Sequence, residues 1–185
     1  MASWQAYLAD PLMRWQVKRR LGDMADIRRV RAVFEGTRLP PPDGVRFRPF
    51  RLGGVPGEWA MTCRKPRTTL LYLHGGGFIA CSPRQYRPLT GALARLGFRV
   101  FAPDYRLAPE HPFPAAVEDT VASWRALRAA ARGRVVVAGD SAGGTLALAL
   151  MVALRDAGER LPDAAAVFSP ATDLAGNSRS LRSNA

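Results

Sequence analysis

The stretch Gly139-Asp140-Ser141-Ala142-Gly143 is the most informative part of this chain, because it has the G-x-S-x-G pattern and lies between two apolar segments. Residues 135–138 (VVVA) before it predict a short strand, and residues 144–156 after it predict a helix. A strand, a tight turn and a helix form the context in which this pattern indicates a nucleophilic serine. We therefore interpret Ser141 as a nucleophile and not as an ordinary turn serine.

Steric crowding explains why this stretch consists of small residues around the serine. A side chain at Gly139 or Gly143 is expected to collide with the neighbouring strand and helix. The helix that follows directs backbone N–H groups and its positive dipole end toward the serine. Asp140 is adjacent to Ser141, and adjacent side chains on a sharp turn point apart. We expect Asp140 to hold the loop by hydrogen bonds and not to act as the triad acid.

A second motif, His74-Gly75-Gly76-Gly77, follows a predicted strand at residues 69–73 (TLLYL). Successive glycines allow the backbone to turn its N–H groups into one pocket. A serine that attacks an ester carbonyl creates an oxyanion, and N–H donors fixed in advance are usually the largest single contribution to catalysis. The predicted oxyanion-hole donors are the amides of Gly75, Gly76 or Gly77, together with that of Ala142.

These two motifs, with the stretch DYRLAPEHPFPAA at residues 104–116 between them, resemble the hormone-sensitive-lipase-like family of α/β-hydrolases, which are bacterial carboxylesterases. The resemblance covers nearly the whole chain. It implies a serine carboxylesterase that cleaves short- to medium-chain esters through an acyl-enzyme, with no metal or organic cofactor. It also implies that His74 supports the glycine loop by hydrogen bonding and is not the base.

From Leu70 onward, predicted strands alternate with predicted helices. The alternation indicates an α/β fold, here the α/β-hydrolase fold, with a mostly parallel sheet and crossover helices. Functional sites lie at the carboxyl ends of such strands, where His74 and Ser141 are both found. The expected strands are 45–52 and 59–63 as a hairpin, then 69–73, 99–102, 135–138 and 164–170, and the expected helices are 84–96, 114–131 and 144–156.

Two parts are expected along the chain. Residues 1–44 predict two helices, broken near Gly22-Asp23, and a linker (LPPPDG) at 39–44. The resemblance implies that these helices form a cap over the active site, and packing of an ordinary subdomain is the alternative. Residues 45–185 are predicted to form a partial α/β-hydrolase core.

The resemblance also implies a triad acid and a histidine that follow the serine along the chain. Only 44 residues follow Ser141, and both histidines, His74 and His111, precede it. We therefore expect a C-terminally truncated chain that lacks the last core strands and is inactive as a fragment. A receptor-like protein that binds a small ligand on the same fold without catalysis is the alternative, as is an inactive relic.

Composition narrows the class of protein. Hydrophobic residues make up 48% of the chain, as in globular proteins, and no run is long enough to span a bilayer. Cys63 and Cys81 are too few for a disulfide framework and match no zinc pattern. The N-terminus has no signal-peptide pattern. We expect a cytoplasmic protein without stable membrane insertion.

The charge of +12 is carried by arginines scattered through every segment, and no basic stretch is interleaved with aromatic residues. We therefore expect a small-molecule ester as the partner and no nucleic acid. The resemblance leaves a homodimer open for a full-length form. Asp104, Arg106 and Glu110 predict a local ion-pair cluster at a strand end, and Trp124 is predicted to lie in the core.

Overall fold

The computed structural model describes residues 26–36, 40–63, 66, 68–175 and 177, and the chain divides into two compact units, 1–38 and 39–185. The described part of the first unit is helix α2 (Ile27–Gly36). The Asp26 carboxylate accepts the Arg29 N–H (3.1 Å) and so caps the helix start. This helix confirms the second of the two predicted N-terminal helices. The first helix and the break near Gly22-Asp23 lie outside the described residues, and the cap role stays a prediction.

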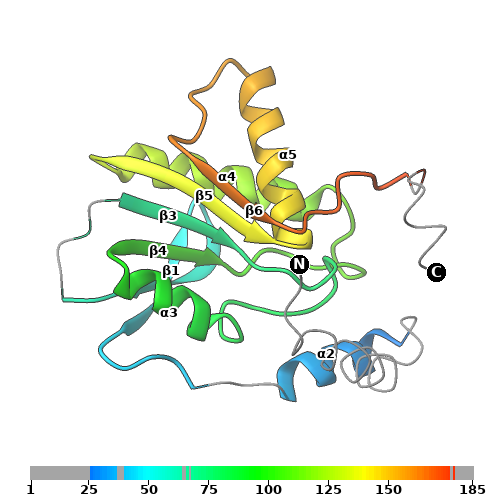
Figure 1. The fold of residues 1–185 in the computed structure, drawn as a ribbon. Coiled ribbons are helices and arrows are strands. Elements are labelled where there is room, and N and C mark those ends of the chain that lie inside the picture. Colours follow the sequence, from blue (N-terminus) through cyan, green and yellow to red (C-terminus); the bar gives the residue numbers. More distant parts are fainter. Residues whose placement is uncertain (1–25, 37–39, 64–65, 67, 176, 178–185) are drawn as a thin grey trace, which may run out of the picture. The chain divides into compact units, whose positions relative to one another are not determined.

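One six-stranded sheet organises the second unit, in the order β1-β2-β4-β3-β5-β6 (Figure 1). The first two strands form an antiparallel hairpin, β2 also pairs antiparallel with β4, and the remaining pairs are parallel. This is the mostly parallel sheet that the sequence predicts. The strands are β1 (Arg46–Leu52), β2 (Val55–Met61), β3 (Thr68–Leu73), β4 (Phe98–Pro103), β5 (Arg134–Asp140) and β6 (Ala165–Phe168).

Helices cover both faces of the sheet. Helix α3 (Arg87–Arg95) packs on one face, and α4 (Ala115–Ala130) and α5 (Ala142–Asp156) pack on the other. Successive side chains of a strand point to opposite faces, so a central strand with helices on both faces buries apolar side chains on both sides. In β3, Leu71 and Leu73 join the core that contains Trp124 and Leu146, whereas Leu70 and Tyr72 join the core that contains Ala94. The prediction of Trp124 as a core residue is confirmed, because its exposed fraction is 1%.

Element boundaries differ from the predicted ones at two informative places. Strand β2 begins at Val55, four residues before the predicted start, because the tight turn at Gly53 and Gly54 takes only two residues with φ of +61° and +82°. Helix α5 begins at Ala142 and not at Gly144. The glycines after the serine are thus helical, and their lack of a side chain serves packing.

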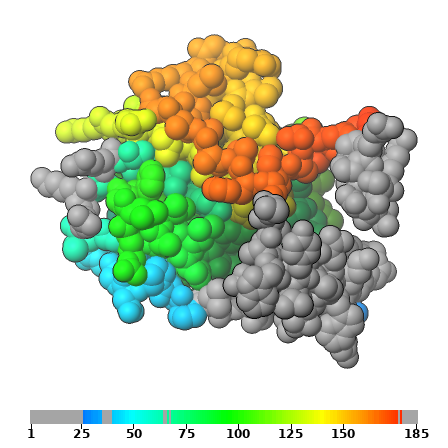
Figure 2. Space-filling view, in the orientation of Figure 1, coloured from blue at the N-terminus to red at the C-terminus, as the bar shows by residue number. Residues whose placement is uncertain are grey.

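Strand β6 lies at the end of the sheet and is mostly exposed. It pairs with β5 on one side, and among the described residues no strand pairs with its other edge. The Phe168 side chain is 60% exposed, and the orange segment that contains β6 lies at the molecular surface (Figure 2).

Candidate active site

Ser141 occupies the turn between β5 and α5 in a conformation that side chains rarely adopt. Its φ is +50° and its ψ is −122°, so the backbone is strained there. Its N–H donates to the Phe168 carbonyl (2.8 Å). Ser141 is the N-cap residue of α5, yet its side chain makes no capping hydrogen bond and is exposed. The hydroxyl is therefore available for chemistry.

Close packing of backbone against backbone holds this turn. A Cβ atom on Gly139 would lie 2.5 Å from the Gly143 carbonyl carbon. A Cβ atom on Gly143 would lie 2.5 Å from the His74 carbonyl oxygen. Real Cβ atoms do not approach so closely, so both positions need glycine. The collision expected from the sequence is thus present, and it brings the two glycine motifs into direct contact.

The glycine loop begins where β3 ends. Leu73 pairs with Gly139 in the parallel ladder, so His74 emerges beside the serine turn. The loop then reverses through Gly76 and Gly77, whose φ values are +119° and +63°. The N–H groups of residues 79 and 80 both donate to the Gly76 carbonyl, at 3.1 and 3.0 Å. These bonds close the reversal without using the Gly76 or Gly77 amide.

The four predicted oxyanion-hole amides are not equivalent. The Gly75 N–H donates to the Tyr86 hydroxyl (2.9 Å) and is engaged in this structure. Among the described residues, no acceptor is recorded for the N–H groups of Gly76, Gly77 and Ala142. Ala142 is also the first residue of α5, where backbone N–H groups lack partners inside the helix. Three of the predicted donors are thus uncommitted.

Asp140 anchors two tyrosines beside the serine. The Tyr72 hydroxyl donates to Asp140 Oδ1 (2.8 Å), and the Tyr86 hydroxyl donates to Asp140 Oδ2 (2.7 Å). Burial and then the bond to Asp140 raise the pKa of both phenols, so both stay protonated donors. The carboxylate therefore holds its surroundings in place, as the sequence predicts for it.

His74 is fully enclosed below the glycine loop. Its Nδ1 donates to the Gly75 carbonyl (2.8 Å), since a carbonyl can only accept, and its ring stacks on Tyr105 with 4.2 Å between centroids. The Tyr105 hydroxyl donates to the His74 carbonyl (2.6 Å). Burial lowers the pKa of His74 to about 4, and Nε2 has no partner among the described residues. A neutral, enclosed imidazole suits a structural role.

No base is recorded at Ser141 within the described residues. Nδ1 of His74 is in hydrogen-bond contact with the Gly75 carbonyl and the Tyr105 hydroxyl, and no hydrogen bond joins the ring to Ser141 in the described part of the chain. His111 is exposed in a turn that its own N–H closes on the Leu107 carbonyl (2.9 Å), and it also makes no bond to the serine. The site as described contains a strained serine and uncommitted amides, without a proton acceptor.

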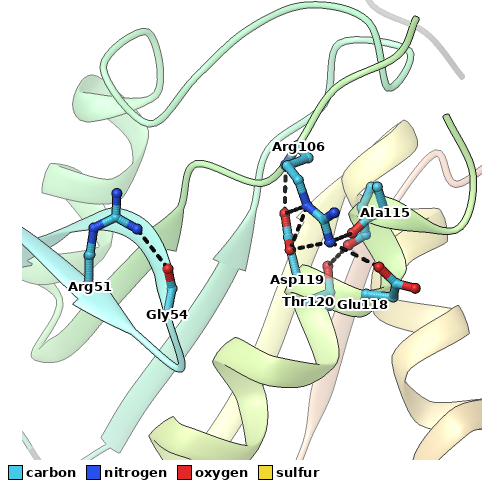
Figure 3. A network of polar contacts seen from close by, with 8 residues as sticks. Arg51, Gly54, Arg106, Ala115, Glu118, Asp119 and Thr120 are labelled. Carbon is cyan, nitrogen blue, oxygen red and sulfur yellow. Dashed lines mark hydrogen bonds and ion pairs between the residues drawn. The ribbon is translucent and has the colours of Figure 1, made fainter. Parts of the chain in front are cut away.

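The sequence predicts that Arg106 pairs with Asp104 and Glu110, and this prediction is wrong for Arg106. Arg106 instead forms a two-pronged ion pair with Asp119 of α4, at 3.0 Å from Nε and 2.8 Å from the terminal nitrogen (Figure 3). The Arg106 N–H also donates to Asp119 (2.8 Å), and Glu118 accepts a further bond at 2.9 Å. Helix α4 therefore holds the loop that contains Arg106, because the buried Asp119 carboxylate needs a cation.

A mainly apolar cavity of about 510 Å³ lies between the glycine loop, the loop at 106–114 and α5. It reaches Gly77 and Thr145, and the Thr145 N–H donates to the Ser141 carbonyl (3.0 Å), one turn along the helix from the serine. An apolar group held near the serine has room there. The other lining residues are Phe78, Ile79, Arg106, Ala108, His111, Phe113, Pro114, Ala116, Val117, Leu146, Ala149 and Leu174.

Comparison with known proteins agrees with this geometry. The sequence profile of the alpha/beta hydrolase fold family matches residues 70–185. The chain belongs to the α/β-hydrolase fold family. An acetyl-hydrolase of Streptomyces hygroscopicus is 47% identical over 150 residues, which is 80% of this chain and 48% of the relative. The hormone-sensitive lipase of Homo sapiens is 37% identical over 60% of this chain and 11% of its own.

Solved structures similar to this chain of the α/β-hydrolase fold family include esterases. An esterase from the bacterial hormone-sensitive lipase family has a TM-score of 0.82 and 37% identity, covering 100% of this chain and 63% of the other. A homologue of hormone-sensitive lipase from a metagenome library has a TM-score of 0.76 and 38% identity over 90% of this chain and 55% of its own. The family resemblance read from the sequence is confirmed. The α/β-hydrolase chain spans about half the length of the curated relatives it matches.

Two further properties concern the described residues of this α/β-hydrolase alone. Its described helices are too short or too polar for a membrane span. Within the same residues, no group of three histidine, cysteine or carboxylate side chains is arranged to hold a metal ion.

Three tyrosines of the site were not predicted: Tyr72, Tyr86 and Tyr105. A weak signal existed for Tyr72, because strand alternation places it two residues before His74 on the same side. No local pattern marks Tyr86, which lies 54 positions before its partner Asp140.

Proposed function

We propose that Ser141 is the nucleophile of a carboxylesterase that hydrolyses short- to medium-chain esters. The observation that carries the proposal is the contact between the two glycine motifs, in which Gly143 packs against the His74 carbonyl. This contact sets the strained serine beside a loop whose Gly76 and Gly77 amides have no recorded acceptor. The relatives named acetyl-hydrolase and esterase support the same reaction class.

In the proposed mechanism, the Ser141 hydroxyl oxygen attacks the ester carbonyl carbon and its proton passes to a general base. The amides of Gly76, Gly77 and Ala142 stabilise the negative charge on the carbonyl oxygen. The carbon–oxygen bond to the leaving group then breaks, and the base returns the proton to the alcohol. Water frees the acyl group from Ser141 by the same steps in reverse order.

The base and its acid partner are proposed to lie outside residues 1–185. In α/β-hydrolases these residues follow the serine along the chain, and this sequence has no histidine after Ser141. Without a base the hydroxyl is a weak nucleophile, and triad members act as a unit. We therefore propose that the 185 residues alone have no significant esterase activity beyond a residual contribution of the amides.

The substrate range follows from the cavity beside the site. Its walls are mainly apolar, and about 510 Å³ has room for an acyl chain of short to medium length. We also propose that the ester is the only small-molecule partner, that neither metal, organic cofactor nor nucleic acid takes part, and that the protein acts in the cytoplasm.

The test uses the natural protein that carries these 185 residues. Hydrolysis of p-nitrophenyl acetate, butyrate and octanoate is compared between the wild type and Ser141→Ala, with EDTA present in a parallel series. We expect turnover of the shorter esters that EDTA does not change, and a loss of at least about 10³-fold in Ser141→Ala. Tight binding of a small acid without any turnover would instead favour the receptor-like alternative.

A further inference from the structure

The hydroxyl group of Tyr86 joins the two motifs of the site. It accepts the Gly75 N–H at 2.9 Å and donates its own proton to Asp140 Oδ2 at 2.7 Å. One oxygen atom thus links the first glycine of the loop to the residue that precedes Ser141. Removal of this hydroxyl would therefore break two bonds, one to the Gly75 N–H and one to Asp140 Oδ2.

Tyr86 lies at the start of helix α3, which hydrogen bonds and an ion pair hold in place. It is the N-cap residue of α3, and its carbonyl accepts both the Thr90 N–H (2.8 Å) and the Thr90 hydroxyl (3.1 Å). The next residue, Arg87, makes a two-pronged ion pair with Glu58 of β2, which is only 6% exposed. A well-anchored helix start therefore presents the phenol to the glycine loop.

Two carbonyls of the loop are already held: His74 Nδ1 donates to that of Gly75, and the N–H groups of residues 79 and 80 donate to that of Gly76. The Tyr86 hydroxyl adds a third fixed point, because it accepts the Gly75 N–H. Gly75 is tightly enclosed: a Cβ atom there would lie 2.5 Å from Asp140 Oδ2 and 2.9 Å from the Tyr86 hydroxyl. The loop is thus clamped at Gly75, directly before the amides that are uncommitted.

Given the esterase function proposed above, we propose that Tyr86 is a positioning residue, whose hydroxyl fixes the Gly75 peptide so that the Gly76 and Gly77 amides point at the developing oxyanion. Tyr86 does not itself touch the reacting atoms. Its contribution is to the transition state, because the oxyanion exists only there, and ground-state binding of the ester does not need it. Loss of the hydroxyl should therefore lower kcat and leave KM nearly unchanged.

Tyr72 provides a matched control. Its hydroxyl donates to the other oxygen of the same carboxylate, Asp140 Oδ1, at 2.8 Å, and it makes no bond to Gly75. Tyr72 is buried and Tyr86 is half-buried, and their rings lie 5.8 Å apart. Tyr72→Phe and Tyr86→Phe therefore each remove one bond to Asp140, but only Tyr86→Phe also releases the loop.

The experiment measures kcat and KM for p-nitrophenyl butyrate in the natural protein and its Tyr86→Phe, Tyr72→Phe and Ser141→Ala variants. We expect Tyr86→Phe to lower kcat by about 10- to 100-fold with KM within about twofold. We expect Tyr72→Phe to lower kcat clearly less than Tyr86→Phe does, because it leaves the bond between the Gly75 N–H and the Tyr86 hydroxyl in place. Inhibition by a trifluoromethyl ketone, which forms a tetrahedral adduct on a serine, should weaken in parallel with kcat.

A Tyr86→Phe variant with wild-type kcat, or a loss of kcat equal to that of Tyr72→Phe, would overturn the positioning role. Turnover that persists in Ser141→Ala would instead overturn the esterase proposal, so the two failures are distinct. Amide hydrogen exchange of the wild type gives a test that needs no variant. The Gly75 amide should exchange much more slowly than those of Gly76 and Gly77, and equal rates at all three would contradict the clamp.

Discussion

A Cβ atom on Gly143 would lie 2.5 Å from the carbonyl oxygen of His74, so the first turn of α5 rests directly on the start of the glycine loop. The distance between nucleophile and oxyanion loop is therefore set by two backbones in contact. Side chains could adjust under strain, but backbone atoms of a strand end and a helix cannot move independently.

Gly143→Ala should consequently disrupt the site. We expect a loss of at least about 100-fold in kcat and a fall of about 1–3 kcal/mol in the free energy of unfolding, because the added methyl group must push α5 from β3. Gly144→Ala is the control, since its Cβ would meet its nearest neighbours only at 3.2 Å. Urea unfolding and ester hydrolysis check both, and equal effects of the two variants would refute the packing argument.

The buried imidazole of His74 should make stability depend on pH. Burial lowers its pKa from 6.5 to about 4, so the unfolded state takes up a proton first as the pH falls. The free energy of unfolding should therefore be highest above pH 6.5 and decrease by roughly 3 kcal/mol as the pH drops to 4. The measurement is urea unfolding between pH 7.5 and 4, where His74→Gln should flatten that part of the curve. The same slope in the variant would assign the effect to other groups.

The ion pair of Arg106 with Asp119 should matter more than exposed pairs. Arg106→Ala would leave a carboxylate of 8% exposure with two of its donors removed. Arg125→Ala breaks a pair with Glu159 in which both side chains are at least one-third exposed. Thermal unfolding should show a clearly lower Tm for Arg106→Ala and nearly the wild-type Tm for Arg125→Ala. The opposite order would contradict the role of burial.

The two cysteines should differ in reactivity. Burial raises the pKa of the Cys81 thiol to about 11, with Asp140 adding to the effect, whereas Cys63 is exposed. Because the thiolate is the nucleophile, Cys81 should react with iodoacetamide at pH 8 about 10- to 100-fold more slowly than Cys63. Mass spectrometry of the two peptides measures the rates, and similar rates would show that the loop around Cys81 opens readily.

Local patterns predicted the fold and the strand–turn–helix segment that carries the candidate nucleophile. Ser141 was recognised because a strand, a glycine-flanked turn and a helix are all encoded within about 20 neighbouring positions. The steric need for Gly139 and Gly143 followed from the same short stretch. The α/β alternation was equally local, since each strand and helix carries its own apolar period.

Partners that depend on tertiary packing were missed for a physical reason. Arg106 was paired with its sequence neighbours, but the carboxylates that bind it lie on α4. Tyr86 and Tyr72 precede their shared partner Asp140 by 54 and 68 positions. No periodicity of the sequence reveals contacts between residues so far apart. Side-chain networks of this kind become visible only when the sheet order brings β3, β5 and α3 together.

A nucleophilic role of Ser141 can be tested by trapping the acyl group on its hydroxyl oxygen. The natural protein that carries these residues is mixed with p-nitrophenyl butyrate, quenched in acid within milliseconds and analysed by peptide mass spectrometry. We predict one butyryl group on the peptide that contains Ser141, and none in Ser141→Ala, which should also lose the burst of p-nitrophenol. Rapid ester hydrolysis with no acyl group on Ser141 and full turnover in Ser141→Ala would contradict a nucleophilic role of Ser141.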